Sequence, residues 1–492
     1  MAVTELESLD SIVSLAKARG FIFQSSDIYG GLGATYDYGP LGVELKRNIR
    51  DIWWKSMTQK HSNIVGVDAA IFMHPNVWKA SGHVEGFNDP MIDDKQSNKR
   101  YQADMLIENE IAKLHGKGKE KKAEELQHLL DTAGSREGLC EDLYNIIIDY
   151  EIRAPESGAF NWTPVRQFNM MFKTQFGATS SDGDDDAVYL RPETAQGIFV
   201  NFKNVMDTAR QKIPFGIAQI GKAFRNEVVA RQFVFRMREF EQMEMQYFVE
   251  PGTDEKYYEQ WLEERFNWHK ELGIRSSKLR SEPHPNKDLA HYAAAASDIE
   301  YEFPIGWQEV EGIHNRTDFD LSRHAKYSGK KLEYYDQQKQ KHYTPYVIET
   351  SIGLDRAVLM VMCDGYREEE VNGDTRTVLK INPKLAPTKV GIFPLIKKEK
   401  LQDLAHKITD DLRSDYNVRY DESGSIGKRY RRQDEAGTPF CITVDFDGVE
   451  SEGEDTVTIR YRDDMTQDRV PVSRLREVID DKMRSWEPED VE

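Results

Sequence analysis

The segment 224–244 constrains the fold of this chain more than any other, because it concentrates charge between two strand-like ends. It contains four arginines and four glutamates around a short polar and basic loop. Two strands that pair in register would bring alternate side chains of both ends to one face. The side chains expected to share that face are Arg225, Glu227, Arg236 and Phe240. A site for a small charged ligand and cross-strand ion pairing on a solvated sheet explain this segment equally well.

Strand-like runs that alternate with turns extend on both sides of this segment, over residues 162–362. Residues 213–220 and 243–249 are clear examples, and residues 233–235 read as a further short strand. Such a mixture predicts an antiparallel sheet with helices attached, an α+β layer. Residues 41–57 have a helical period and a wide apolar face, which predicts a helix that is buried or faces another subunit.

Changes in composition divide the chain. Lys, Glu, Leu and Ala dominate residues 103–150, which predicts an exposed helical insertion, a solvated arm. Prolines gather at residues 382–387, where we place a domain boundary, and the pattern after it predicts a compact α/β module. That module contains the only strongly basic cluster of the sequence, at residues 424–432. The acidic run at residues 487–492 is expected to be disordered.

Length, charge and cysteine content limit the class of protein. A chain of 492 residues predicts two or three domains. A net charge of −19 argues against non-specific coating of nucleic acid, although a local basic groove is compatible with it. Cys140, Cys363 and Cys441 are far apart, which predicts reduced thiols and neither disulfides nor a cysteine zinc site. The sequence has no signal-peptide pattern and no run of about 18 apolar residues, so a soluble cytoplasmic protein is expected.

One apparent nucleotide motif fails. Residues 216–222 follow the phosphate-loop pattern until Ala223, where a Mg²⁺-binding Ser or Thr is required. The residues between its glycines are apolar and strand-like, and the dinucleotide fingerprint and the zinc-protease motif are absent from the sequence. Nucleotide chemistry in this chain must therefore use arginine side chains.

A second candidate anion site lies at residues 349–356. A strand ends there, Gly353 permits a tight turn, and an apolar helix begins close to Arg356. A cation in the first turn of a helix opposes the helix dipole, so a bound anion would relieve the conflict. Residues 191–197 and 308–318 also place carboxylates beside turn residues, but each alone predicts only an ordinary turn.

Taken together, these segments resemble the class II aminoacyl-tRNA synthetases and, among them, the glycyl-tRNA synthetases of the homodimeric type. Residues 39–43 with 63–75 resemble motif 1, the dimer-forming element, residues 224–244 resemble motif 2, and residues 349–362 resemble motif 3. Residues 429–443 resemble the anticodon-binding domain of that family. Other family-like strings are 30–32, 37–40, 81–83, 166–173, 191–197 and 315–320. The co-linear series covers nearly the whole chain and is far more specific than any single motif.

The resemblance implies an α+β catalytic domain, an antiparallel sheet flanked by helices, with a helical insertion and a C-terminal α/β anticodon-binding domain. The implied parts are residues 1–102 with motif 1, the insertion at 103–160, the catalytic core with motifs 2 and 3 at 161–382, the anticodon-binding domain at 388–485 and the tail at 486–492.

The implied reaction attaches glycine to its tRNA in two steps. ATP and glycine form glycyl-adenylate with release of pyrophosphate, and the glycyl group then moves to the 3′-terminal adenosine of glycine tRNA. Catalysis would consist of positioning and of electrostatic stabilisation of charge on the α-phosphate. The implied partners are glycine, ATP with Mg²⁺, glycine tRNA and a second copy of the chain, with no membrane.

The motifs assign roles by position. Arg225 would contact the α-phosphate and Arg356 the γ-phosphate, which makes these two the expected catalytic residues. Arg236 would assist the phosphates, Phe240 would stack on adenine, and Glu227 would meet the adenine edge. The expected ATP-binding set is Arg225, Asn226, Glu227, Phe235, Arg236, Phe240, Glu309, Val310, Gly353, Leu354, Asp355 and Arg356.

Glycine has no side chain to recognise, so its pocket must fix the ammonium group and exclude a Cβ. Carboxylates can do both, and a rigid ion-paired wall would reject alanine by a clash. The expected glycine-binding set is Arg100, Glu193, Phe240, Glu241, Gln242, Met243, Glu244, Glu349, Thr350, Ser351, Ile352 and Gly353. The expected anticodon-binding candidates are Lys428, Arg429, Arg431 and Arg432.

Two expectations concern metals, and one concerns a departure from the family. Glu309 is the candidate ligand of the Mg²⁺ on ATP. Many relatives carry a Cys-rich knuckle where this chain has residues 93–100, so no zinc is predicted there. Thr350 stands where relatives commonly have a proline that shapes the turn.

Two alternatives stay open. A sister synthetase for threonine, proline or serine is one, although a threonine enzyme would need a hydroxyl reader that the sequence does not show. A synthetase-like tRNA-binding or regulatory protein without catalysis is the other. Loss of a motif arginine would mark it, yet Arg225 and Arg356 are both present.

Overall fold

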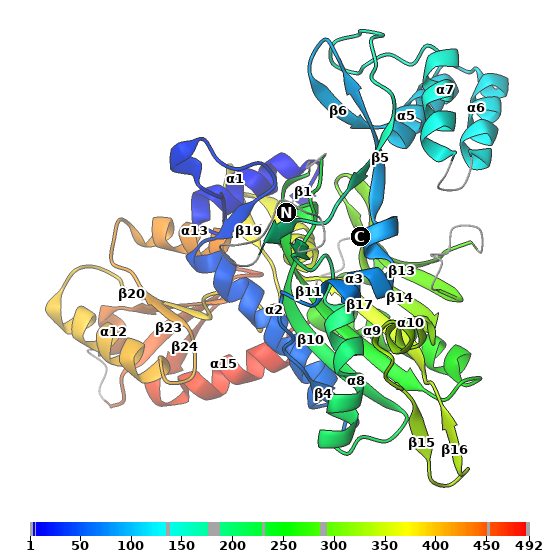
Figure 1. The fold of residues 1–492 in the computed structure, drawn as a ribbon. Helices are drawn as coiled ribbons and strands as arrows, with labels where there is room; N and C mark the ends of the chain where they lie inside the picture. Colours follow the sequence, from blue (N-terminus) through cyan, green and yellow to red (C-terminus); the bar gives the residue numbers. More distant parts are fainter. Residues whose placement is uncertain are drawn as a thin grey trace.

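The computed structural model of the chain describes residues 3–4, 6–133, 138–175, 187–228, 232–285, 293–449 and 453–488 (Figure 1). A seven-stranded sheet forms its centre, an insertion projects from one end, and a smaller sheet lies to the side. Within these ranges no helix is long and apolar enough to cross a membrane.

The central sheet has the strand order β12, β13, β14, β17, β11, β10, β4. Neighbouring strands pair antiparallel, except that the edge strand β4 runs parallel to β10. The predicted antiparallel sheet flanked by helices is therefore confirmed. Its strands are β12 (Leu279–Pro283), β13 (Ala295–Phe303), β14 (Gly306–Thr317), β17 (Tyr346–Gly353), β11 (Glu239–Val249), β10 (Phe215–Phe224) and β4 (Ile64–Gly66).

The two faces of this sheet differ in chemistry because side chains alternate along each strand. Met243, Met245 and Ile352 are fully buried on one face, in the main hydrophobic core. Glu244 and Glu349 come from the same strands and occupy the other face. Three helices cover the apolar face: α2 (Pro40–Thr58), α9 (Asp254–Leu272) and α11 (Leu354–Gly365). Two pack on the polar face near the far strand ends: α8 (Ala195–Thr208) and α10 (Phe319–Ser328).

The helix expected at residues 41–57 is α2. Its Leu45, Ile49 and Trp53 are fully buried, so the wide apolar face packs on the core. A Cβ at Gly42 would lie 1.8 Å from the carbonyl oxygen of Phe21, so only glycine permits this close approach of the helix to the preceding chain.

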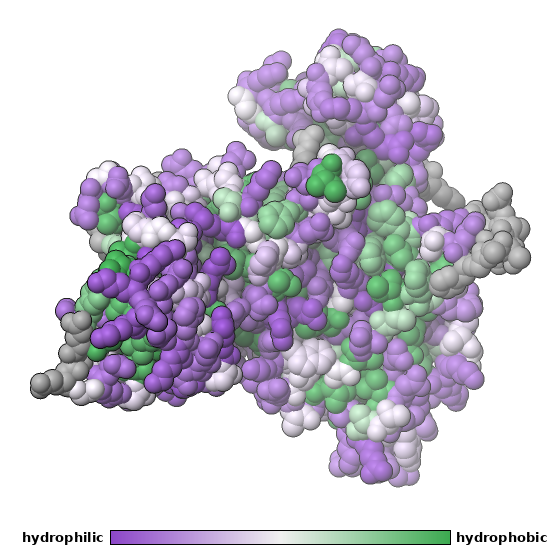
Figure 2. Space-filling view, turned by 90° about the vertical axis from the view of Figure 1, so that its left-hand side faces the viewer, coloured by the Kyte–Doolittle hydropathy of each residue, from purple (hydrophilic) through white to green (hydrophobic). Residues whose placement is uncertain are grey.

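The insertion is a separate lobe with a core of its own, visible at the top of Figures 1 and 2. Leu126, Ile147 and Trp162 are buried in that core, so the expected solvated arm is wrong. Strands precede and follow the helices, so the lobe extends beyond the predicted bounds of 103–160 on both sides. The elements are β5 (Asn88–Asp94), β6 (Lys99–Gln102), α5 (Ala103–Gly116), α6 (Glu120–Thr132), α7 (Leu139–Asp149) and β7 (Arg166–Asn169).

The C-terminal module is the predicted α/β unit, with the strand order β21, β20, β22, β23, β24. β24 and α15 extend it beyond the elements expected from sequence. Trp486, directly before the segment predicted to be disordered, donates a hydrogen bond to Asp463 at 2.8 Å, while residues 489–492 of that segment lie outside the described residues. The elements are β20 (Val390–Pro394), α12 (Glu399–Leu412), β21 (Val418–Tyr420), α13 (Ile426–Ala436), β22 (Phe440–Val444), α14 (Phe446–Val449), β23 (Thr456–Tyr461), β24 (Gln467–Pro471) and α15 (Leu475–Arg484).

A buried cluster of charges, here called the interdomain cluster, joins this module to the central part. Arg376, on β19, contacts Glu369 on β18 at 2.6 Å and Asp434 on α13 at 2.8 Å. Arg460 pairs with the same Asp434 at 2.8 Å. Lys380 reaches Glu369 at 2.8 Å. Both carboxylates of the cluster are thus paired with cations.

The remaining elements are short. They are β1 (Val3–Thr4), α1 (Leu9–Arg19), β2 (Ile22–Gln24), β3 (Tyr36–Tyr38), α3 (Pro75–Ser81), α4 (His83–Gly86), β8 (Lys173–Gln175), β9 (Ala187–Tyr189), β15 (Tyr334–Asp336), β16 (Lys341–Tyr343), β18 (Tyr366–Val371), β19 (Asp374–Leu379), and 3₁₀ turns at Asp27–Tyr29, Phe233–Phe235, Ser276–Lys278 and Val472–Arg474.

Candidate active site

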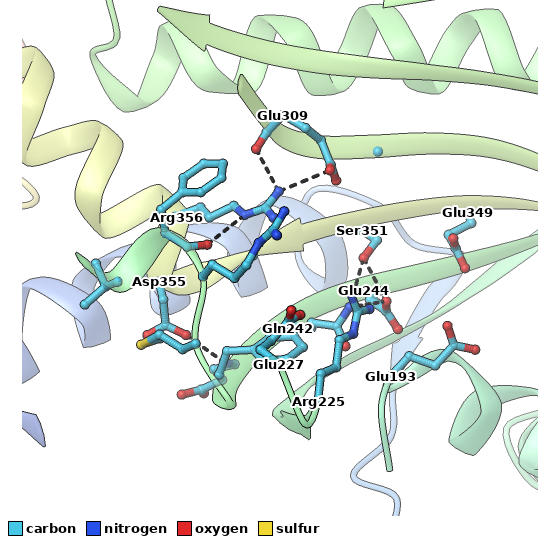
Figure 3. A pocket seen from close by; sticks show the side chains of 18 of the residues that line it. Glu193, Arg225, Glu227, Gln242, Glu244, Glu309, Glu349, Ser351, Asp355 and Arg356 are labelled. Atoms are coloured by element: carbon cyan, nitrogen blue, oxygen red, sulfur yellow. Dashed lines mark hydrogen bonds and ion pairs between the residues drawn. The ribbon is translucent and has the colours of Figure 1, made fainter. Parts of the chain in front are cut away.

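A cavity of about 250 Å³ lies on the polar face of the central sheet, over β11, β14 and β17 (Figure 3). Its arginine end contains Arg225, Arg236 and Arg356 together with Glu227, Glu309 and Asp355, and its carboxylate end contains Glu193, Glu244 and Glu349. In Figure 3, Arg225 lies between Arg356 and these three glutamates. The predicted site residues that line it are Glu193, Arg225, Glu227, Phe235, Arg236, Phe240, Glu241, Gln242, Glu244, Glu309, Glu349, Ser351, Gly353, Asp355 and Arg356.

The loop between β10 and β11 supplies the first arginines. The strand expected at residues 233–235 is a 3₁₀ turn, because Gln232 and Phe233 have φ angles of 70° and 57°, which no strand continues. Arg225 follows the last residue of β10 and donates from Nε to the Pro192 carbonyl at 3.1 Å. Arg236 makes no hydrogen bond or ion pair in the described part of the chain, so its guanidinium group is free to meet a ligand.

Arg356 lies in the first turn of α11, as predicted, and is held from three sides. Its guanidinium donates to the Glu309 carbonyl at 2.9 Å and to the Glu309 carboxylate at 3.1 Å. Nε donates to the Phe235 carbonyl at 3.3 Å, and the Phe235 ring centre lies 4.3 Å from the guanidinium carbon. These contacts orient a cation at the mouth of the cavity without burying it.

Asp355 fixes the turn that presents Arg356. Its carboxylate accepts hydrogen bonds from Lys46 and from the backbone N–H of Glu241, each at 2.8 Å, and from the Tyr38 hydroxyl. The helix start, the end of β11 and helix α2 are therefore tied together at one carboxylate.

Three glutamates form the other end of the cavity, and each has a different environment. Glu349 accepts from Arg316 at 3.1 Å and from Gln246 at 2.7 Å. Glu193 accepts from Gln196 at 2.8 Å. Glu244 accepts from the Ser351 hydroxyl at 2.7 Å, from Gln242 at 3.0 Å, and from the Thr194 hydroxyl. Among the described residues Glu244 has no ion pair.

These environments separate the acidities of the three carboxyls. Burial raises the pKa of Glu244 to about 8, and the nearby charges of Glu349 and Glu193 add to the effect. Burial also acts against ionisation of Glu349, but Arg316 and His314 outweigh it and lower the pKa of Glu349. In the same way His83 and Arg316 overcome burial and lower the pKa of Glu193. The environments therefore favour the ionised form of Glu193 and Glu349 and the neutral form of Glu244.

Several predicted residues do not line the cavity. Met243, Thr350 and Ile352 point to the opposite face of the sheet, since they alternate with Glu244, Glu349 and Ser351. Thr350 is fully buried there, and β17 runs unbroken through it, so the missing proline does not interrupt the wall of the site.

The other predicted residues outside the cavity are explained by their positions. Val310 and Leu354 are buried in the main core. Asn226 uses its backbone N–H to reach the Met170 carbonyl at 2.7 Å. Arg100 lies on β6 in the insertion, paired with Asp93 at 2.6 Å, which places it away from the glutamates.

Sequence reasoning missed other lining residues: Val234, Met237, Gly312 and His314. Gly312, His314 and Arg316 alternate along β14 and share one face, which is a signal that the sequence contains. Plain alternation would place Glu309 on the other face, but a register shift opposite Ile299 and Glu300 brings it to the cavity as well. The sequence predicted a turn rather than a strand for this segment.

The basic cluster of the C-terminal module is partly structural. Arg429 is buried and donates to the Pro394 carbonyl at 2.6 Å and to the Gly424 carbonyl at 2.9 Å, so it is wrong as a nucleic-acid contact. Arg432 pairs with Asp421. Lys428 is exposed without an ion pair in the described residues, and Arg431 is half-exposed beside it.

Potential metal ligands are sparse. The described ranges contain no group of three or more His, Cys, Asp or Glu side chains suited to a metal ion. At residues 93–100, Asp93 pairs with Arg100 and Arg166. Glu309, with one carboxylate oxygen on Arg356, is half-exposed at the mouth of the cavity. One carboxylate of this kind suits Mg²⁺ that takes its other ligands from phosphates and water.

Comparisons with known proteins agree with this arrangement. Family models described as tRNA synthetase class II core domain (G, H, P, S and T), Glycyl-tRNA synthetase insertion domain 1 and Anticodon binding domain match residues 172–364, residues 89–131 with 118–170, and residues 389–482, respectively. The chain is similar in fold to a prolyl-tRNA synthetase from Cryptosporidium parvum complexed with L-proline and AMP, with a TM-score of 0.62 and 14% identity over 98% of this chain and 77% of that one.

Curated relatives match over nearly the full length. A glycine–tRNA ligase of Chlorobaculum tepidum is 55% identical over 96% of this chain and 100% of its own. One of Treponema denticola is 49% identical over 97% of this chain and 98% of its own. With a class II core, the insertion of glycyl-tRNA synthetases and an anticodon-binding domain in one chain, the protein belongs to the glycine–tRNA ligases, the class II synthetases that charge tRNA with glycine.

Proposed function

We propose that the charging reaction runs in two steps at this cavity. Glycine and ATP first form glycyl-adenylate and pyrophosphate, and the glycyl group then passes to the 3′-terminal adenosine of glycine tRNA. The observation that carries the proposal is the meeting of an arginine end and a carboxylate end in one cavity (Figure 3). The first suits a triphosphate and the second suits an ammonium group, and both reactants must be adjacent for the carboxylate of glycine to attack the α-phosphate.

At the arginine end, Arg225 stabilises the charge that develops on the α-phosphate, Arg236 assists, and Arg356 binds the γ-phosphate. The Phe240 ring supplies a face for adenine, and Glu227 meets the adenine edge. Glu309 would hold Mg²⁺, which would supply positive charge against the triphosphate. The support is that Arg225 and Arg356 are oriented by backbone carbonyls, which leaves guanidinium nitrogens for a ligand.

At the carboxylate end, Glu193, Glu244 and Glu349 surround the ammonium group of glycine. Their hydrogen bonds to Gln196, Ser351, Arg316 and other side chains make the wall rigid. We expect such a wall to reject alanine by overlap with its Cβ, which is a stronger penalty than the loss of a favourable contact.

The tRNA would lie along the first two turns of α13. Lys428 lies in the first turn, Arg431 and Arg432 lie in the second, and the chain before them is exposed. Positive side chains there would pair with phosphates of the anticodon arm.

A second copy of the chain would cover an exposed apolar patch near the N-terminus. Ile28 is 89% exposed, Tyr29 87% and Leu32 56%. Apolar residues gathered in this way commonly mark a protein interface. In sedimentation equilibrium the protein should have twice the mass of the 56.9 kDa chain. Replacement of Ile28 by Asp should shift it toward the single-chain mass, and a protein that is monomeric at all concentrations would contradict the proposal.

The exchange of pyrophosphate into ATP tests the first step directly. Glycine should support exchange, whereas alanine, serine and threonine should not, and absence of glycine-dependent exchange would overturn the proposal. Arg225→Ala should lower the exchange rate by about 10²- to 10³-fold, because a group aimed at developing charge is lost. Arg280→Ala is the matched control. Arg280 also lies over an aromatic ring, Trp307 at 4.6 Å, but outside the cavity.

A further inference from the structure

Two segments of the chain connect the insertion to the central part, and both pass beside the cavity. The outgoing connection is α4 (His83–Gly86) with Phe87, and the returning one is Asn169 with Met170. They are tied to each other, because Met170 donates to the Phe87 carbonyl at 3.0 Å and the Asn169 side chain donates to the Val84 carbonyl at 3.2 Å. The root of the insertion is thus one structural unit.

This root contacts the arginine end of the cavity. The guanidinium carbon of Arg225 lies 5.5 Å from the ring centre of Phe87 and 5.2 Å from that of Phe240. The backbone N–H of the next residue, Asn226, donates to the Met170 carbonyl at 2.7 Å. Of the two rings that hold Arg225, one belongs to the central sheet and the other to the insertion root.

The same root contacts the carboxylate end. His83 Nε2 lies 3.6 Å from a carboxylate oxygen of Glu193, and its Nδ1 is 2.7 Å from the Ser81 hydroxyl, which fixes the ring. The His83 ring packs on Trp78 and on Phe87, with ring centres 5.6 Å and 5.5 Å away. One short segment therefore contacts Glu193 through His83 and Arg225 through Phe87.

We propose that Phe87 and His83 are positioning residues for the charging reaction, through which the insertion sets the geometry of both ends of the site. Phe87 holds Arg225 against Phe240 in the orientation that meets the α-phosphate, and His83 holds Glu193 toward the ammonium group. The inference rests on the roles proposed above for Arg225 and Glu193.

The Phe87→Leu variant tests the arginine end. It keeps an apolar side chain but removes the ring face, so kcat of glycine-dependent pyrophosphate exchange should fall about tenfold, with the KM for glycine within about twofold of the original. Phe87→Tyr keeps the ring and should restore kcat. Phe168→Leu is the matched control, because Phe168 makes the same kind of contact with Arg100 at 5.5 Å inside the insertion, and it should leave kcat unchanged.

Phe87→Leu in an Arg225→Lys protein distinguishes the positioning of Arg225 from a general loss of structure. In an Arg225→Lys protein the ring has no guanidinium plane to hold, so adding Phe87→Leu should change kcat by less than about twofold. An undiminished tenfold loss in that background would overturn the role of Phe87. If instead Arg225→Ala retains the original exchange rate, the proposed function of Arg225 fails, and that result is distinct from a failure of Phe87 alone.

The His83→Phe variant tests the carboxylate end. It keeps the ring between Trp78 and Phe87 but removes the contact with Glu193, so the KM for glycine should rise about tenfold while the KM for ATP stays within about twofold. An unchanged KM for glycine in a protein with an unaltered thermal midpoint would overturn the role of His83.

Discussion

Two of the buried groups of arginines and carboxylates in the described part of the chain, the interdomain cluster and the cavity, are built differently. In the interdomain cluster, Asp434 is paired with Arg376 and Arg460, and Glu369 with Arg376 and Lys380. In the cavity, Glu349 is paired with Arg316, but Glu244, 2% exposed, meets only hydroxyl and amide groups.

The difference separates a structural cluster from a binding one. A buried carboxyl without a cation is costly to ionise, so the free protein keeps it neutral. A cationic ligand that enters would supply the missing partner. We therefore interpret the imbalance at Glu244 as the binding site for the ammonium group of glycine.

The largest expected effect is on stability, at the interdomain cluster. Arg376→Met leaves Glu369 and Asp434 short of a partner in a buried site, which should lower the free energy of unfolding by about 3–5 kcal/mol. Thermal unfolding followed by calorimetry measures it. Arg476→Met is the control: Arg476 pairs with Asp411 and Asp415 on the surface, so its loss should cost less than about 1 kcal/mol. Equal shifts in the two variants would break the comparison.

Glu244→Gln should have the opposite effects, a large loss of activity and no loss of stability. Removing the charge that meets the ammonium group should lower kcat/KM for glycine by about 10²-fold. The thermal midpoint should not fall. Relative to the original protein it should rise as the pH increases from about 4 to about 8 and then level off. This sign follows because the raised pKa of Glu244 means that the folded protein holds a proton that the unfolded chain releases, so the original protein loses stability between the unfolded pKa and the folded pKa of about 8. A fall in stability comparable to that of Arg376→Met would show that Glu244 is structural.

The pH dependence of glycine activation sharpens the same point. The pKa of Glu244 is raised to about 8, so at lower pH the free site favours its neutral form. Binding of an ammonium group favours the ionised form. The value of kcat/KM for glycine should therefore rise by up to about tenfold per pH unit between pH 6 and 8 and then level off. Glu244→Gln should abolish this rise. A profile that is flat from pH 6 to 8 in the original protein would contradict the assignment.

The smallest expected effect concerns Lys428, a cation with no carboxylate partner among the described residues. Lys428 is exposed, so Lys428→Ala should raise the KM for tRNA only a few fold and reduce its salt dependence by about one counter-ion, with pyrophosphate exchange unchanged. Arg429→Ala should instead lower stability, because it empties a buried position that holds two carbonyl groups. If Arg429→Ala affected only tRNA binding, its assignment as structural would be wrong.

The strand-like runs of the sequence predicted the sheet, and the family resemblance supplied much of the cavity. Strand alternation separates Glu244 from Met243 and Glu349 from Thr350, but the predicted glycine-binding set included both members of each pair. The prediction failed where a segment rich in charged residues nevertheless has a buried apolar side. The Lys and Glu of residues 103–150 suggested a solvated arm, but the apolar residues of three helices face one another, with Leu126 and Ile147 fully buried.

Two further misses have local causes. The apolar run Phe233–Phe235 read as a strand, but left-handed backbone at Gln232 and Phe233 turns the chain instead. Arg429 read as exposed because it is charged, yet its guanidinium is satisfied by carbonyl groups that are distant in the sequence or fixed by a turn. The residue type alone predicts neither the backbone angle nor the position of a carbonyl group.

Proton release on glycine binding tests the central claim most directly. Glycine added to the protein in weakly buffered solution at pH 7, with a pH indicator, should release about one proton per site, because Glu244 passes from acid to carboxylate as the ammonium group binds. Glu244→Gln at saturating glycine should release none. Binding of glycine to the original protein without proton release would contradict the account, because it would mean that Glu244 is already ionised or does not meet the ammonium group.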